Sequence, residues 1–134
     1  MRLLVLAFYL LCLVSCSKEN PLQQAELLQL HQDENVNVSL SPADAPVEQI
    51  LYWTVRLSKG WHIQQAEVTG LSMSMGTIPL LFKAVDGHPE LYSAEMVLGA
   101  CSQPHMQWQL QLTLLHATQG EKLLLLPFYS SWSD

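Results

Sequence analysis

The chain has 134 residues, with twelve acidic side chains against six basic ones, a formal net charge of −6, and 49% hydrophobic residues. This acidic balance disfavours nucleic acid and anionic lipid headgroups as partners, because both repel a negatively charged surface. Roughly 100 residues beyond the N-terminal segment are enough for one small domain with its own core.

The first sixteen residues have the pattern of a bacterial lipoprotein signal. Arg2 supplies a positive charge, residues 3–13 form an apolar run, and Leu13-Val14-Ser15-Cys16 follows at once. The apolar run is about half the roughly 20 residues that a membrane-spanning helix needs, which favours cleavage over a permanent span. An ordinary secretory signal with a chance cysteine is the alternative interpretation.

Resemblance to lipoprotein signals implies that residues 1–15 are removed and that the sulfur of Cys16 is acylated, which leaves 134 − 15 = 119 residues. Ser17, rather than Asp, follows the lipidated position and resembles the outer-membrane sorting pattern. We therefore expect a lipid-anchored protein of the cell envelope that faces the periplasm, most simply from the outer membrane.

Processing changes the cysteine count. Cys12 leaves with the signal and Cys16 becomes a thioether, so Cys101 remains as the one free thiol of the mature chain. In an oxidising compartment a lone thiol is a liability unless it is buried, bonded to a partner chain or held by a metal. A buried cysteine that acts as a small apolar side chain is the plainest of these alternatives.

Residues 16–34 are polar and glutamine-rich, and we predict that they form the lipidated cysteine and a tether. Asn20-Pro21 has the features of a helix start, whereas Leu27–His31 is the alternative, a first strand. Residues 130–134 read as a polar tail.

Between these segments the apolar residues repeat with a period of two, which is typical of half-buried strands. The cleanest example is Met106–Leu114, where large apolar side chains alternate with glutamine and threonine. Turn signals such as Lys59-Gly60 and Asp86-Gly87 separate the runs. The pattern predicts an all-β domain over residues 35–129, a small antiparallel immunoglobulin-like β-sandwich of about seven strands. The predicted strands are 36–40, 51–57, 63–68, 78–85, 91–98, 106–114 and 123–128.

Motifs of enzyme chemistry are absent from the sequence. It has no Gly-rich phosphate loop, no His-Glu-x-x-His, no Gly-x-Ser-x-Gly and no Cys-x-x-Cys. We therefore do not expect an enzyme.

Soft metal ligands are the positive signal. Met73 and Met75 are two residues apart, so on a strand both thioethers would point to the same side and suit a Cu(I) site. The alternative is that both pack in the core beside Leu71. A second candidate follows along the chain, where Cys101, His105 and Met106 lie within six residues. Thiolate, imidazole and thioether favour copper over hard ions, and a thiolate would bind zinc as well.

The sequence resembles the YtkA-like and FixH-like periplasmic domains, which are small immunoglobulin-like sandwiches. The likeness rests on Gly70–Pro79, on Tyr92-Ser93-Ala94 and on Gly99 with Met106–Leu110. It implies a part in copper handling for respiratory enzymes, with a copper-delivery or oxidase-assembly protein as partner. Within that resemblance, Met73 and Met75 match the Met pair of the family.

These observations together predict a lipid-anchored β-sandwich that binds Cu(I) and sequesters or passes it. The expected ligands are Met73 and Met75, with help from Cys101, His105 or Met106. The alternative is an envelope interaction lipoprotein without a metal, whose sheet edge or apolar patch docks a membrane protein.

Overall fold

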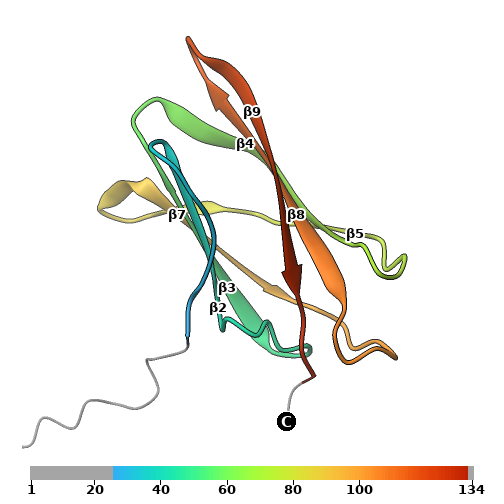
Figure 1. Cartoon of the computed structure of the whole chain (residues 1–134). Helices are drawn as coiled ribbons and strands as arrows, with labels where there is room; N and C mark the ends of the chain where they lie inside the picture. Colours follow the sequence, from blue (N-terminus) through green and yellow to red (C-terminus); the bar gives the residue numbers. More distant parts are fainter. Residues whose placement is uncertain (1–25, 133–134) are drawn as a thin grey trace, which may run out of the picture.

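The computed structural model describes residues 26–132, which form nine strands in two sheets (Figure 1). One sheet has the order β1-β2-β3-β7-β6 and the other β5-β4-β8-β9, and all neighbouring strands are antiparallel. The predicted fold class, an antiparallel β-sandwich, is confirmed. Within residues 26–132 no helix is long and apolar enough to cross a membrane. The strands are β1 (Leu28–Gln32), β2 (Val36–Ser41), β3 (Ile50–Leu57), β4 (Trp61–Gly70), β5 (Thr77–Pro79), β6 (Lys83–Val85), β7 (His88–Val97), β8 (Gln107–His116) and β9 (Gly120–Tyr129).

Two differences explain why nine strands are found where about seven were predicted. Strand β1 lies in the stretch predicted as a tether, where a first strand over Leu27–His31 was the alternative, and this alternative is confirmed. The run 78–85, predicted as one strand, is divided into β5 and β6, which belong to different sheets. Between them Leu80 is buried and its N–H donates to the Ala66 carbonyl, so the chain crosses from one sheet to the other at this point.

The domain is also longer than predicted at both ends. In β1, Leu28 lies opposite Leu40, and Leu28 and Leu30 pack against the core, so the sandwich begins at β1 rather than at residue 35. At the other end, Ser130 is buried and its Oγ accepts a hydrogen bond of 3.1 Å from Trp108 Nε1. Residues 130–132 are therefore part of the fold rather than of a polar tail. The predicted signal peptide, Cys16 and residues 133–134 lie outside the described residues.

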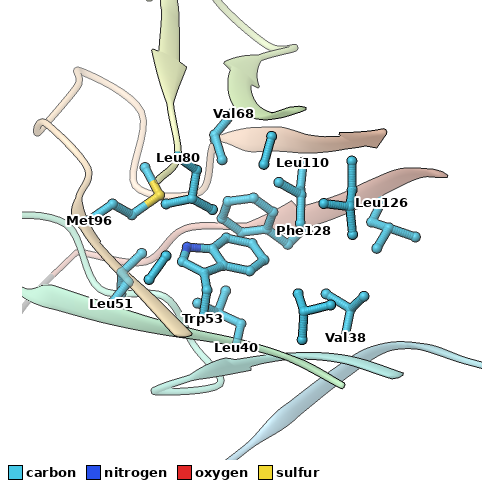
Figure 2. Packing of buried hydrophobic residues seen from close by; sticks show 14 of the residues in the cluster. Val38, Leu40, Leu51, Trp53, Val68, Leu80, Met96, Leu110, Leu126 and Phe128 are labelled. Atoms are coloured by element: carbon cyan, nitrogen blue, oxygen red, sulfur yellow. The ribbon is translucent and has the colours of Figure 1, made fainter. Parts of the chain in front are cut away.

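The core lies between the two sheets and follows the alternation in the sequence (Figure 2). In β8 the even-numbered side chains from Trp108 to Leu114 are buried, and the odd-numbered ones are partly exposed. Trp53 of one sheet meets Phe128 of the other edge to face, with ring centroids 5.2 Å apart and an interplanar angle of 78°. Each such buried aromatic or aliphatic side chain contributes about 1.5–3 kcal/mol through removal of apolar surface from water.

The connections gather at two opposite ends of the sandwich. We call the first the sulfur end, because it contains Met73, Met75 and Cys101. Backbone hydrogen bonds join its segments: Val47 N–H donates to the Ser131 carbonyl and Glu48 N–H to the Leu98 carbonyl. We call the second the ionic end, because Asp33 forms an ion pair with Lys122 there. The sulfur end comprises residues 26–28, 42–49, 71–76, 98–106 and 130–132. The ionic end comprises residues 33–35, 58–60, 86–87 and 117–119.

Candidate functional site

The methionine pair lies in the loop that connects β4 to β5, so the strand geometry that would point both thioethers to one side does not apply. Gly70 ends β4, and the N–H groups of Leu71 and Ser72 both donate to the Gln107 carbonyl, which turns the chain back over the start of β8. Met73 and Met75 are 37% and 38% exposed, so the alternative that they fill the core is wrong. Both methionine side chains are partly accessible to a ligand from solvent.

Cys101 lies in the loop between β7 and β8 and reaches the methionine loop. Its side chain is half-buried against the core, and its thiol Sγ donates to Met73 Sδ at 3.0 Å. The two sulfur atoms come from residues 28 apart in sequence. The fold therefore brings together one member of each of the two groups of ligands that the sequence suggested.

The methionine loop is also bonded to the start of β8 through the Ser72 side chain. The N–H of Gln107, the first residue of β8, donates to Ser72 Oγ at 2.8 Å. Since Ser72 precedes Met73, this bond holds the methionine loop against the segment that carries Cys101. The sequence analysis missed this role of Ser72, because a single serine between apolar residues gives no signal.

Gly70 is the second residue that the sequence analysis missed. A Cβ at this position would lie 2.6 Å from the Met73 carbonyl oxygen, 3.4 Å from Met75 Cβ and 3.6 Å from Met106 Cε. Only a residue without a side chain permits this close approach of the loop. The glycine at the end of the strand was the available signal, since an isolated glycine there often marks a close backbone contact.

Met106 and His105, adjacent in sequence, lie in different surroundings. Met106 is 1% exposed and packs in the core, on the face that the alternation predicted, with its methyl group below Gly70. His105 is exposed and lines a groove of about 580 Å³ between β1 and β9, together with Leu28, Asp44 and Tyr129. Neither Met73 nor Cys101 lines this groove. The participation of His105 and Met106 in one joint metal site stays a prediction.

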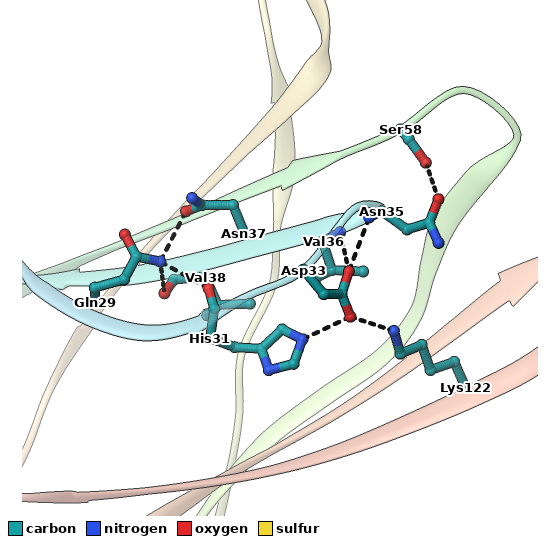
Figure 3. Close-up of polar contacts among 9 residues, drawn as sticks. All are labelled: Gln29, His31, Asp33, Asn35, Val36, Asn37, Val38, Ser58 and Lys122. Atoms are coloured by element: carbon teal, nitrogen blue, oxygen red, sulfur yellow. Dashed lines mark hydrogen bonds and ion pairs between the residues drawn. The ribbon is translucent and has the colours of Figure 1, made fainter.

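The ionic end has a different chemistry, centred on Asp33 (Figure 3). One carboxylate oxygen accepts hydrogen bonds from the N–H groups of Asn35 and Val36, and the other contacts His31 Nε2 and Lys122 Nζ. The Lys122 ammonium holds the pKa of Asp33 well below its usual range and outweighs the upward effect of burial, and His31 and the two N–H groups lower the pKa further. This carboxylate joins the turn before β2 to β9 of the opposite sheet.

Nitrogen and oxygen ligands do not cluster as the sulfur atoms do. Among residues 26–132, no group of three or more His, Cys, Asp and Glu side chains is placed to hold a metal ion. The candidate functional site is therefore the thiol of Cys101 and the thioether of Met73, with Met75 in the same loop as Met73.

A comparison with solved structures supports the fold. The chain is similar to a DUF4426 family protein from Pseudomonas aeruginosa PAO1, known from a crystal structure, with a TM-score of 0.52 and 12% sequence identity. The match covers 79% of this chain and 99% of that chain. No family model and no curated protein matches the sequence. The likeness shows a shared β-sandwich fold and transfers no site residue.

Proposed function

We propose that this protein is a lipid-anchored, periplasm-facing β-sandwich that binds Cu(I) at its sulfur end and sequesters or passes it. The observation that carries the proposal is the contact of 3.0 Å between Cys101 Sγ and Met73 Sδ. Soft sulfur ligands select Cu(I) over the hard cations, so this pair has the donor chemistry for that ion.

The spacing of the sulfur atoms fits a shared ion after a small movement. Two ligands about 2.3 Å from one metal, at an angle near 110–120°, lie about 4 Å apart. The pair at 3.0 Å would therefore open by about 1 Å. The loop that carries Met73 allows this movement because its side chains are exposed and its anchoring bonds end at Ser72.

The Cys101 thiolate and the Met73 thioether would contribute differently to the binding and release of copper. Cys101 would lose its thiol proton on binding, because thiolate is the form that ligates metals. The Met73 thioether remains neutral and exchanges easily, which suits transfer to another protein. Met75, in the same loop and 38% exposed, supplies a further thioether within the same short segment.

The resemblance to YtkA-like and FixH-like domains supports a proposal about which proteins would receive the copper. Met73 and Met75 match the Met pair of that family, and the family resemblance implies delivery to respiratory oxidases through a copper-delivery or oxidase-assembly protein. The lipoprotein signal pattern that ends at Cys16 supports attachment to a membrane, where a respiratory oxidase and its assembly proteins would be found.

An anaerobic Cu(I) titration against a competing chelator tests the proposal. The expected result is that the mature protein binds one Cu(I) and that the Met73→Leu/Cys101→Ala double variant loses this binding. Met96→Leu is the matched control, because Met96 is a buried thioether of β7 and Met to Leu conserves volume. Absence of binding by the unmodified protein, or equal loss in the control, would contradict the proposal.

A second candidate function is the envelope interaction lipoprotein without a metal. It is favoured by the outer face of β9, where Leu123, Leu125 and Tyr129 are each about half exposed on an edge strand. Pro127 of the same strand has no N–H to offer to a further strand, which limits simple edge pairing. Failure of copper binding together with capture of one membrane protein through this face would favour this function instead.

A further inference from the structure

Exposed apolar side chains are concentrated at the sulfur end of the described domain. Twelve large hydrophobic side chains are more than about a third exposed, and eight of them lie in or next to the segments of the sulfur end. The loops of the ionic end contain none of the twelve. The eight are Leu27, Ile50, Leu71, Met73, Met75, Val97, Tyr129 and Trp132.

The charged side chains are also distributed unevenly between the two ends. The described domain has four basic side chains, and all of them lie outside the segments of the sulfur end. The sulfur end carries Glu26, Asp44 and Glu48. A surface that is apolar, weakly acidic and without cations gains nothing from anionic headgroups, so apolar contact and a covalent anchor would have to hold it on a membrane.

The chain enters the domain at this same end. Leu28, the first residue of β1, lies opposite Leu40 near the end of β2, and the described chain starts two residues earlier, at Glu26 (Figure 1). Glu26 follows Cys16 by ten residues along the chain (26 − 16 = 10). Such a segment spans at most about 36 Å, so an acylated Cys16 keeps the sulfur end within that distance of the bilayer.

Trp132 has the arrangement of an interfacial aromatic side chain. Its Nε1–H donates to the Gln103 carbonyl at 3.2 Å, while the residue is 53% exposed. Tyr129 nearby in sequence is 59% exposed. Tryptophan and tyrosine are enriched at membrane–water interfaces, because one part of the ring system is apolar and the other forms hydrogen bonds.

We infer that the sulfur end rests on the phospholipid surface in which Cys16 is anchored, with Trp132 and the methionine loop at the level of the headgroups. This inference rests on the lipid anchor of the proposed function, and it adds an orientation. Cys101 and Met73 would then face the membrane, so their copper would exchange with a membrane-embedded partner rather than with a soluble carrier. The ionic end would point into the aqueous compartment.

Fluorescence quenching of the mature, acylated protein on phosphatidylethanolamine/phosphatidylcholine vesicles tests this orientation. The probe is Trp132, since Trp53, Trp61 and Trp108 are buried, and the emission lost in Trp132→Phe identifies its signal. Lipids with a nitroxide near the headgroup should remove most of the Trp132 emission, and aqueous iodide should remove little. As a matched control, Gln119→Trp in the Trp132→Phe background reports on the ionic end, where the reverse pattern is expected.

Equal iodide quenching of Trp132 and of the Gln119→Trp probe, without quenching by the nitroxide lipids, would overturn the inference and leave the sulfur end open to a protein partner in water. Sedimentation with the vesicles reports on the anchor separately: a protein that does not sediment overturns both the anchor and the orientation. The copper titration has its own readout, so a failed titration and a failed orientation are distinguishable.

Discussion

The two ends of the sandwich are built from the same strands but differ in chemistry. At the ionic end, one carboxylate is fully engaged: Asp33 accepts two backbone N–H groups and contacts His31 and Lys122. At the sulfur end, two soft side chains contact each other and remain partly open to solvent. A polar group whose hydrogen bonds are all formed stabilises the fold. Partly exposed sulfur atoms that contact only each other are available to bind a ligand.

The comparison separates positions that hold the fold together from positions on which the proposed copper site depends. The Asp33–Lys122 pair joins the two sheets, so its loss should affect stability and not metal binding. Changes in the loop 71–76 should affect the site while the sandwich persists, because this loop contributes no strand to either sheet.

The largest expected effect comes from the core that both ends share. Phe128→Ala removes a ring that is 2% exposed and packs on Trp53, and should lower the free energy of unfolding by about 3–5 kcal/mol. Urea denaturation measures this loss, and the proposed copper ligands and the ionic contacts should weaken together as the unfolded fraction rises. A loss below about 1 kcal/mol would show that the sheets are not held by this contact.

A smaller effect, confined to the sulfur end, is expected for Gly70→Ala. The new Cβ would meet the Met73 carbonyl oxygen at 2.6 Å, so the loop must move, at an expected cost of about 1–3 kcal/mol. Displacement of Met73 should weaken Cu(I) binding and speed the reaction of Cys101 with a thiol reagent. Gly99→Ala is the control, because a Cβ there meets nothing within 4 Å. Identical thiol reactivity in the two variants would contradict the positioning role of Gly70.

The ionic end should respond to pH and not to copper. Because the pKa of Asp33 is lowered in the folded protein, its stabilising effect is complete above the unfolded pKa of about 3.9 and is lost as the pH falls further toward the folded pKa. Asp33→Asn should cost about 1 kcal/mol at neutral pH, a modest value since the Asp33 and Lys122 side chains are partly exposed, and the difference should shrink below about pH 4. Asp86→Asn, in another turn of the same end, serves as control. A constant difference down to acidic pH would be inconsistent with the ion pair.

The smallest effect is expected for Met75→Leu. The Met75 Cβ lies toward Gly70, whereas Met73 is the methionine that contacts Cys101. Cu(I) affinity should fall by at most about tenfold, or about 1.4 kcal/mol, and by less than in Met73→Leu. The same chelator competition measures both variants, and a larger loss for Met75→Leu would assign the main thioether ligand to Met75.

The sequence predicted the sandwich because its strands alternate cleanly, as β8 does over Gln107–His116. The predicted strands 63–68 and 78–85 left the methionine pair between them, but the turn made by the Leu71 and Ser72 N–H groups toward Gln107 could not be derived from this run. The Cys101–Met73 contact could not be derived from spacing either. It depends on the register that places Gly70 opposite Trp108, and this register follows from packing over the whole sheet rather than from local sequence.

Copper K-edge X-ray absorption on the Cu(I)-loaded mature protein, compared with Cys101→Ala, tests the central claim most directly. The account predicts a first shell that contains sulfur at about 2.3 Å and that loses a sulfur scatterer in the variant. A first shell of nitrogen and oxygen alone, near about 2.0 Å and unchanged in Cys101→Ala, would contradict the assignment of copper to the sulfur end.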